Sequence, residues 1–289
     1  MIDLLESCPI LFWISAGGFG LLVGSFLNVV IHRLPLMMER EWRSEFAILL
    51  GSSTGEESPE KFNLMTPRSR CPDCNHQISA LENIPILSYL VLGGKCGGCR
   101  APISVRYPLI ELLSGLTTAV IAIHFGFGAA AGCAFLLSWS LVTLAAIDID
   151  TQFLPDAITL PLLWAGIVAN YFNVFVSLED AILGAIFGYL SLWTVFWLFK
   201  FATGKDGMGY GDFKLLAVLG AWLGWQLLPV IIVLSSVIGA CVGIALMMFW
   251  SHDKSKPIPF GPYLAVGGWI ALLWGDAIMA RYLFGSSPL

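Results

Sequence analysis

The sequence predicts an all-α protein that crosses a membrane several times, and three observations carry this prediction. Hydrophobic residues make up 57% of the 289-residue chain and charged residues only 12%, a composition typical of polytopic membrane proteins. Apolar segments of spanning length recur along the chain. One long polar stretch, residues 32–107, separates the first apolar segment from the second. We therefore expect about eight transmembrane helices, with a small zinc-binding cytoplasmic loop domain between helices one and two.

The apolar segments define the expected helices and domains. A helix needs about 20 apolar residues to span a bilayer, and the sixth segment is shorter than that. We expect it to be a half-span, or a helix lining a cavity, with its ends covered by protein or water. The first segment has no basic residue before it and is long enough to span, so we interpret it as a helix rather than a cleavable signal. The expected spans are 10–31, 108–124, 127–147, 157–176, 180–199, 213–224, 226–250 and 260–280; the expected domains are 1–31 (first transmembrane helix), 32–107 (loop domain) and 108–289 (membrane core).

The positions of the basic residues predict the orientation. Nine of the fifteen Lys and Arg residues fall within 32–107, and such segments stay in the cytoplasm. Alternating the eight spans from there places fourteen of the fifteen on the same side and the N-terminus on the other. The formal net charge of -5 is too small to indicate a nucleic-acid partner.

Four cysteines in the polar stretch predict a metal site. Cys71 and Cys74 form one Cys-x-x-Cys pair, and Cys96 and Cys99 form a second. Four thiolates at this spacing suit tetrahedral zinc, whereas a reducing cytosol disfavours disulfides. Four sulfur ligands leave no open position, so the zinc would be structural. His76 is an alternative ligand, although a lone imidazole beside such a site is more often polar surface.

An acid directly behind a glycine-rich stretch and directly ahead of an apolar segment predicts a functional site. Asp212 ends the run Gly207–Asp212, and a carboxylate at the edge of lipid is costly enough to be functional by default. Helix capping is the structural alternative. Gly209 and Gly211 favour a site, because glycine permits close approach of the backbone to a substrate and positive φ.

A partner acid lies at the end of the third apolar segment. Asp148 and Asp150 are two residues apart, so on a helix they point about 200° away from each other. Asp148 is the deeper of the two, and we expect it to face inward. Asp156 is expected to cap the fourth helix. Glu111, early in the second helix, is expected to pair with Arg33 or Arg106 or to touch substrate. No repeat of fixed period is evident.

Two aspartates in one partly dry cavity predict peptide hydrolysis. They share a proton, because both cannot ionise cheaply. The ionised one can activate water while the protonated one binds the carbonyl oxygen. A membrane-inserted helix with a basic leader on the cytoplasmic side would be the natural substrate. An ion-coupled transporter would also place acids at helix ends, and a non-catalytic, zinc-stabilised adaptor would use them only as caps.

Motifs along nearly the whole chain resemble those of the type IV prepilin peptidase family. The Gly-x-Gly-Asp motif alone also resembles presenilin-like intramembrane proteases, so the combination makes the resemblance specific. The motifs are Gly24–Asn28 with Arg33–Pro35, Glu82–Pro85 between the cysteine pairs, Arg106–Pro108 with Glu111, Asp148 with Leu154–Asp156, Gly209–Asp212, and Pro259–Pro262.

The resemblance implies a bifunctional enzyme of a Gram-negative inner membrane that serves type IV pili or type II secretion. It would cleave the leader of prepilins and pseudopilins with Asp148 and Asp212 as the catalytic pair. It would then N-methylate the new terminal residue with S-adenosylmethionine. Residues that bind this methyl donor are not indicated, because no strand followed by Gly-x-Gly-x-x-Gly is evident.

Overall fold

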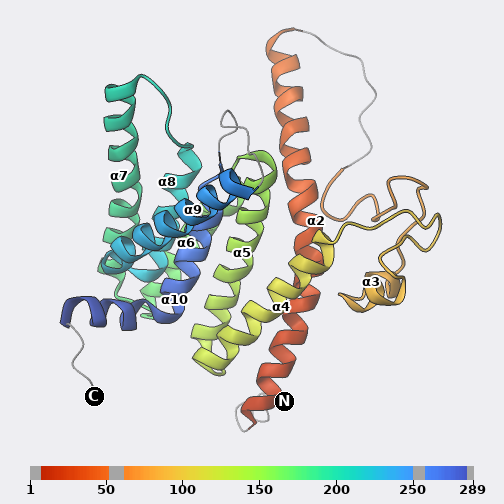
Figure 1. Cartoon of the computed structure of the whole chain (residues 1–289), viewed down its shortest axis with the longest axis horizontal. Coiled ribbons are helices and arrows are strands. Elements are labelled where there is room, and N and C mark those ends of the chain that lie inside the picture. Colours follow the sequence, from red (N-terminus) through yellow and green to blue (C-terminus); the bar gives the residue numbers. More distant parts are fainter. Residues whose placement is uncertain (1–7, 52–61, 250–257, 285–289) are drawn as a thin grey trace. The chain divides into compact units, whose positions relative to one another are not determined.

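The computed structural model describes residues 8–51, 62–249 and 258–284, and across these ranges it contains helices and no β-strand. The N-terminus, predicted to be periplasmic, lies outside the described residues. The chain forms two compact units, Met1–Phe127 and Gly128–Leu289. The helices are α2 (Pro9–Leu49), η1 (Leu81–Asn83), α3 (Leu87–Val91), α4 (Arg106–Phe125), α5 (Ala129–Thr151), α6 (Asp156–Tyr171), α7 (Leu178–Thr203), α8 (Tyr210–Leu223), η2 (Trp225–Leu227), α9 (Leu228–Phe249) and α10 (Gly261–Phe284) (Figure 1).

Each of the eight predicted segments is helical, but within the described ranges six are long and apolar enough to cross a membrane. The exceptions are α6 with 16 residues and α8 with 14. At 1.5 Å per residue they reach about 24 and about 21 Å, less than the roughly 30 Å of a bilayer's hydrocarbon core. The all-α membrane fold is therefore confirmed, whereas the count of eight spans is not.

In the first unit, α2 packs closely against α4 through glycines. A Cβ on Gly20 would lie 2.5 Å from Thr118 Oγ1, and a Cβ on Gly24 would lie 2.7 Å from Glu111 Cα. On the facing helix, a Cβ on Gly115 would lie 2.5 Å from Leu21 Cδ2. Such small residues allow transmembrane helix backbones to approach each other. This packing fixes α4 against the first span.

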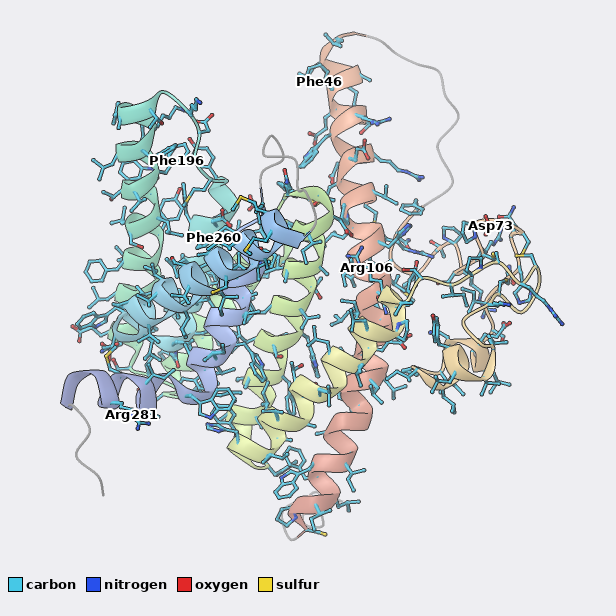
Figure 2. The ribbon with its side chains drawn as sticks, viewed as in Figure 1. Phe46, Asp73, Arg106, Phe196, Phe260 and Arg281 are labelled. Atoms are coloured by element: carbon cyan, nitrogen blue, oxygen red, sulfur yellow. The ribbon has the colours of Figure 1, made fainter. Side chains whose placement is uncertain are left out.

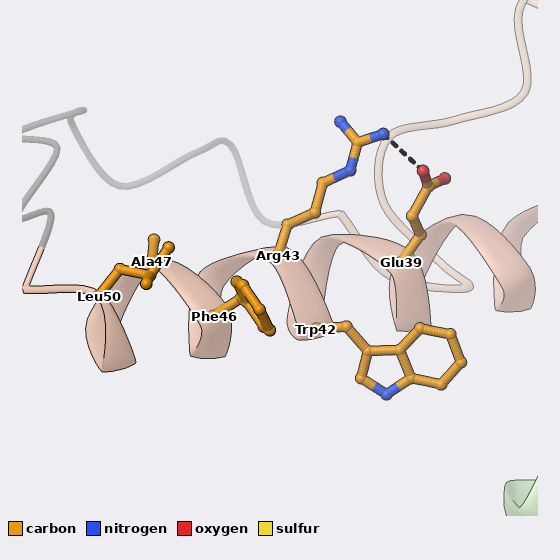
Figure 3. A pocket seen from close by; sticks show the side chains of 6 residues that line it. All are labelled: Glu39, Trp42, Arg43, Phe46, Ala47 and Leu50. Atoms are coloured by element: carbon orange, nitrogen blue, oxygen red, sulfur yellow. Dashed lines mark hydrogen bonds and ion pairs between the residues drawn. The ribbon is translucent and has the colours of Figure 1, made fainter.

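α2 has 41 residues and continues well past the end of its predicted span at residue 31. Polar residues with good helix propensity extend it as an amphipathic helix. On one side Arg43 forms a 2.6 Å ion pair with Glu39, and on the other Trp42 and Phe46 are exposed (Figure 3). The hollow along this helix end contains none of the predicted site residues, so we do not regard it as an active site.

The second unit is built around α8, whose residues from Leu215 to Leu223 are all buried. A helix that is apolar all round requires burial on every side, and α6, α7 and α10 supply it. Gly184 of α7 and Gly220 of α8 touch so closely that neither position has room for a Cβ. The expectation that protein would cover a short sixth segment is thus confirmed.

Polar side chains bind the C-terminal end of α8. The amide of Asn170 donates to the carbonyls of Ala221 and Trp222 at 2.9 and 3.0 Å. The indole of Trp222 donates to the carbonyl of Leu162 at 2.8 Å. Because a helix that ends inside protein must find partners for its last carbonyls, these bonds hold α8 at a fixed depth.

Candidate active site

Asp148 lies in the last turn of α5 and is 5% exposed, whereas Asp150 is exposed. The neighbouring residues therefore have opposite orientations, as their spacing on a helix requires. The Asp148 carboxylate accepts a 3.1 Å hydrogen bond from the backbone N–H of Gly261, the first residue of α10. A Cβ on Gly261 would lie 2.6 Å from this carboxylate, so glycine is required for the close approach.

Asp212 is 6% exposed and lies inside the first turn of α8, not before it. Gly209 occupies the N-cap position, so Asp212 is not the N-cap residue itself. Its carboxylate nevertheless accepts a hydrogen bond from the backbone N–H of Gly209, so a capping role stands beside the site role. Asp212 lies outside the six candidate spans. Its pKa is raised to about 7, mainly because the carboxyl group is buried and secondly because the charge of Asp148 is near. Because the charge of Asp148 acts on Asp212, the two buried carboxyl groups belong to one site.

The two glycines before Asp212 do not adopt the positive φ that their pattern suggested. Gly209 has φ -81° and ψ 150°, which other residues also adopt. Gly211 instead provides space, because a Cβ there would lie 2.8 Å from the Cβ of Leu154. Leu154 would also lie 3.4 Å from a Cβ on Gly261. Its buried side chain therefore packs between the turn that carries Asp212 and the start of α10 that binds Asp148.

A residue not singled out from the sequence, Lys214, ties this site together. Its Nζ donates to both carboxylate oxygens of Asp156 at 2.7 and 2.8 Å. Asp156 was expected to be an N-cap, but Pro155 holds that position. Lys214 lies two residues after Asp212, and Asp156 lies two residues after Leu154. The ion pair therefore joins the segment that carries Asp212 to the segment whose Leu154 packs against it.

Lys214→Met should lower kcat of the peptide hydrolysis predicted from the sequence by about 10- to 100-fold and leave KM nearly unchanged, because a small displacement of a catalytic group is enough for such a loss. Steady-state cleavage assays would measure both constants. Lys205→Met, at an exposed position in the preceding loop, is the matched control. Exchanging the charges with Asp156→Lys and Lys214→Asp should recover part of kcat. Wild-type kcat in Lys214→Met would show that the pair does not position Asp212.

The four cysteines of the polar stretch form a single cluster. Their sulfur atoms all lie within 4.8 Å of one another, with Cys71 and Cys99 at 3.8 Å and Cys74 and Cys96 at 3.9 Å. A tetrahedron with zinc–sulfur bonds of about 2.3 Å has sulfur–sulfur edges of about 3.8 Å. The donor set therefore fits a tetrahedral metal.

His76 does not join the cysteine cluster. Its Nε2 lies 3.1 Å from a carboxylate oxygen of Glu82. The backbone N–H of Ser79 donates to the same carboxylate at 2.8 Å. This hydrogen bond is the largest cause that lowers the pKa of Glu82 to about 2, and hydrogen bonds with the Ser79 hydroxyl and with His76 contribute less. The alternative of His76 as a ligand finds no support here.

The two cysteine pairs lie in equivalent backbone turns, a repeat that the sequence analysis missed. In both turns the first cysteine's N–H donates to the carbonyl five residues later: Cys71 to His76 at 2.9 Å, and Cys96 to Ala101 at 2.8 Å. Asn75 and Arg100, each directly after a pair's second cysteine, both have positive φ. The signal was the spacing basic-Cys-x-x-Cys-x-x-x-Ile-Ser, which occurs at 70–79 and again at 95–104.

Glu111 is buried in α4 and binds the loop rather than an arginine. Its carboxylate accepts a 2.8 Å hydrogen bond from the N–H of Ile86 and another from the hydroxyl of Ser25. Arg33 donates instead to the carbonyls of Asn63 and Pro67 at 2.9 and 2.7 Å. Among the described residues Glu111 has no ion pair, so the expected Glu111–Arg33 pairing is wrong.

Comparisons with known proteins agree with this architecture. Residues 19–125 match the family model of the bacterial peptidase A24 N-terminal domain, and residues 135–244 match that of the type IV leader peptidase family. Proteins from Stutzerimonas stutzeri and Pseudomonas aeruginosa are each 56% identical over 98% of this chain and 97% of their own length. One from Aeromonas salmonicida is 56% identical over 98% of both chains. All three are named prepilin leader peptidase/N-methyltransferase. No solved structure matches.

The fold and site define a polytopic membrane protein with two buried, interacting aspartates and a four-cysteine loop module. The chain belongs to the type IV leader peptidase family.

Proposed function

We propose that this protein is a membrane aspartyl endopeptidase that removes the leader of type IV prepilins and type II secretion pseudopilins. The observation that carries the proposal is the pairing of Asp148 with Asp212, both buried and electrostatically coupled. The names of relatives that are 56% identical over nearly the whole chain supply the substrate class. The ion-coupled transporter and presenilin-like alternatives are not favoured, because these relatives are prepilin peptidases.

The environments of the two acids indicate different roles. We assign to Asp148, whose carboxylate accepts the Gly261 N–H, the role of taking a proton from the attacking water. Asp212, with its raised pKa, would be protonated and would donate a hydrogen bond to the scissile carbonyl oxygen. The water oxygen then bonds to the carbonyl carbon, the peptide C–N bond breaks, and the leaving amine gains a proton.

The family also implies a second reaction, methylation of the new N-terminal amine. The relatives' names include N-methyltransferase, and we propose S-adenosylmethionine as the donor. Within the described ranges no β-strand precedes a glycine-rich turn, so we assign no residue to this donor and derive no step through it.

We propose zinc as the metal of the cysteine cluster, held by Cys71, Cys74, Cys96 and Cys99, with a purely structural role. The remaining assignments follow the family: a multi-pass protein of the bacterial inner membrane, a periplasmic N-terminus and an active site on the cytoplasmic side. Residues 1–31, 32–107 and 108–289 remain our proposed division into a first helix, a loop domain and a membrane core.

Mass spectrometry of the products from a purified enzyme and a prepilin peptide would test both activities. Cleavage should release the leader whether or not S-adenosylmethionine is present. The mature peptide should gain the mass of one methyl group only when the donor is added. An intact peptide under both conditions would refute the peptidase, whereas cleavage without added methyl would refute only the transferase.

A further inference from the structure

The segment between the two cysteine pairs exposes apolar side chains that the fold of the first unit leaves uncovered. From Asn83 to Gly94 there is no charged residue. Leu87 is 56% exposed, Leu90 68% and Val91 77%. Ile84 and Leu81, just before this helix, are also exposed. A cluster of large exposed apolar residues on so small a module marks an interaction surface.

A hydrogen bond fixes the position of this segment along α4, one of the six candidate spans. Ile86, which precedes α3, donates its N–H to Glu111 at 2.8 Å. Glu111 lies five residues after Arg106, where α4 begins, and is therefore about 7.5 Å further along the helix. α3, which begins directly after Ile86, is therefore tied to the first turns of α4 by this hydrogen bond.

The backbone geometry of Ile86 indicates that its surroundings hold this segment in place. Its φ is +59°, a conformation that β-branched residues rarely adopt and that persists only where the surroundings impose it. The Glu111 carboxylate is the contact that holds its N–H. The strained turn directs the chain from Pro85 into α3 at the level of the span.

Lipid is the partner that fits this surface. Near Glu111, α4 exposes Leu109, Leu112 and Leu113, which belong to a candidate span. The first charged residues after the apolar segment are Lys95 and Arg100, and both are exposed. Basic residues beside an apolar segment are typical of proteins that contact anionic lipid headgroups. α3 has only five residues, far fewer than the roughly 20 that a helix needs to span the hydrocarbon core.

We propose that residues 84–92 form an interfacial anchor, which lies in the headgroup region of the membrane with Leu87, Leu90 and Val91 toward the acyl chains. The anchor fixes the four-cysteine module against the membrane surface, with the Glu111–Ile86 hydrogen bond setting its height. It requires neither substrate nor catalysis. This role is independent of the proposed peptidase activity.

The test places an environment-sensitive fluorescent amino acid at Leu90 in the full-length protein. Met65, which is 85% exposed in the same unit, is the matched control position. Both variants are reconstituted in nanodiscs of phosphatidylethanolamine and phosphatidylglycerol. Brominated lipid should quench the probe at position 90 and not at position 65. Aqueous iodide should quench position 65 several-fold more strongly than position 90.

Charge substitution provides a second measurement. With the probe at Leu87, Val91→Glu should increase iodide quenching several-fold, because the charge would draw the segment into water. Metal content checks that the module stays folded. Equal iodide quenching at positions 65 and 90 in lipid alone would overturn the proposal. So would protection of position 90 that arises only after a prepilin peptide is added, because it would make the peptide the occupant.

Discussion

Asp148→Asn and Asp212→Asn should each abolish leader removal and still give a folded membrane protein. We expect cleavage to fall by at least about 10³-fold, the scale on which enzymes lose activity when one member of a catalytic unit is removed. Asparagine keeps the volume of each side chain, and at position 148 it can still accept the Gly261 N–H. It cannot take up or release a proton, so water activation fails. The measurement is product mass after incubation with a prepilin peptide.

Asp150→Asn is the matched control, since Asp150 is exposed and lies two residues from Asp148 on the same helix. It should cleave at the wild-type rate. Thermal unfolding of all variants in detergent would separate lost chemistry from lost structure. Full processing by either Asp148→Asn or Asp212→Asn would remove the paired-aspartate mechanism, whatever the family of the chain.

Local patterns in the sequence were sufficient for the apolar helices and the four-cysteine cluster. Apolar length predicts a helix because the bilayer demands one, and the Cys-x-x-Cys spacing predicts a cluster because two residues between thiolates suit one metal. The depth of Asp148 also followed from its own neighbours. Such features require no knowledge of what another part of the chain contributes.

Features that depend on contacts distant in sequence were missed. Lys214 looks like an ordinary charge after a glycine turn, and only the fold brings it to Asp156. Gly211 was expected to allow positive φ and the close approach of a substrate, but the side chain that comes close to it in the fold is that of Leu154. Glu111 was expected to pair with an arginine or to touch substrate. Its partner is the backbone N–H of Ile86, which no sequence rule predicts.

The length of α2 was missed for a different reason. Hydropathy marks where the membrane ends, but a helix ends only where its capping or propensity fails. The helix passes through Pro35, just beyond the predicted end of the span, and between Leu36 and Leu50 the sequence has neither glycine nor proline. α4, by contrast, ends together with its apolar segment, at Gly126.

Cys71→Ser should remove the bound metal and unfold the loop module. The purified wild-type protein should contain about one equivalent of zinc, which metal analysis by mass spectrometry would measure. Little apolar material is buried between residues 62 and 105, so metal–thiolate bonds must supply most of the folding energy. The variant should contain almost no zinc, and limited proteolysis should cut it within this stretch.

The backbone repeat sharpens this prediction. Because Cys71 and Cys96 are the buried first cysteines of equivalent turns, Cys71→Ser and Cys96→Ser should lose zinc to the same extent. Cys241→Ser, at an exposed cysteine of α9 far outside the cluster in sequence, should keep the wild-type content. A metal-free native protein would refute the zinc site. Loss of zinc in only one of the two variants would mean that the turns, although alike in hydrogen bonding, do not share one metal equally.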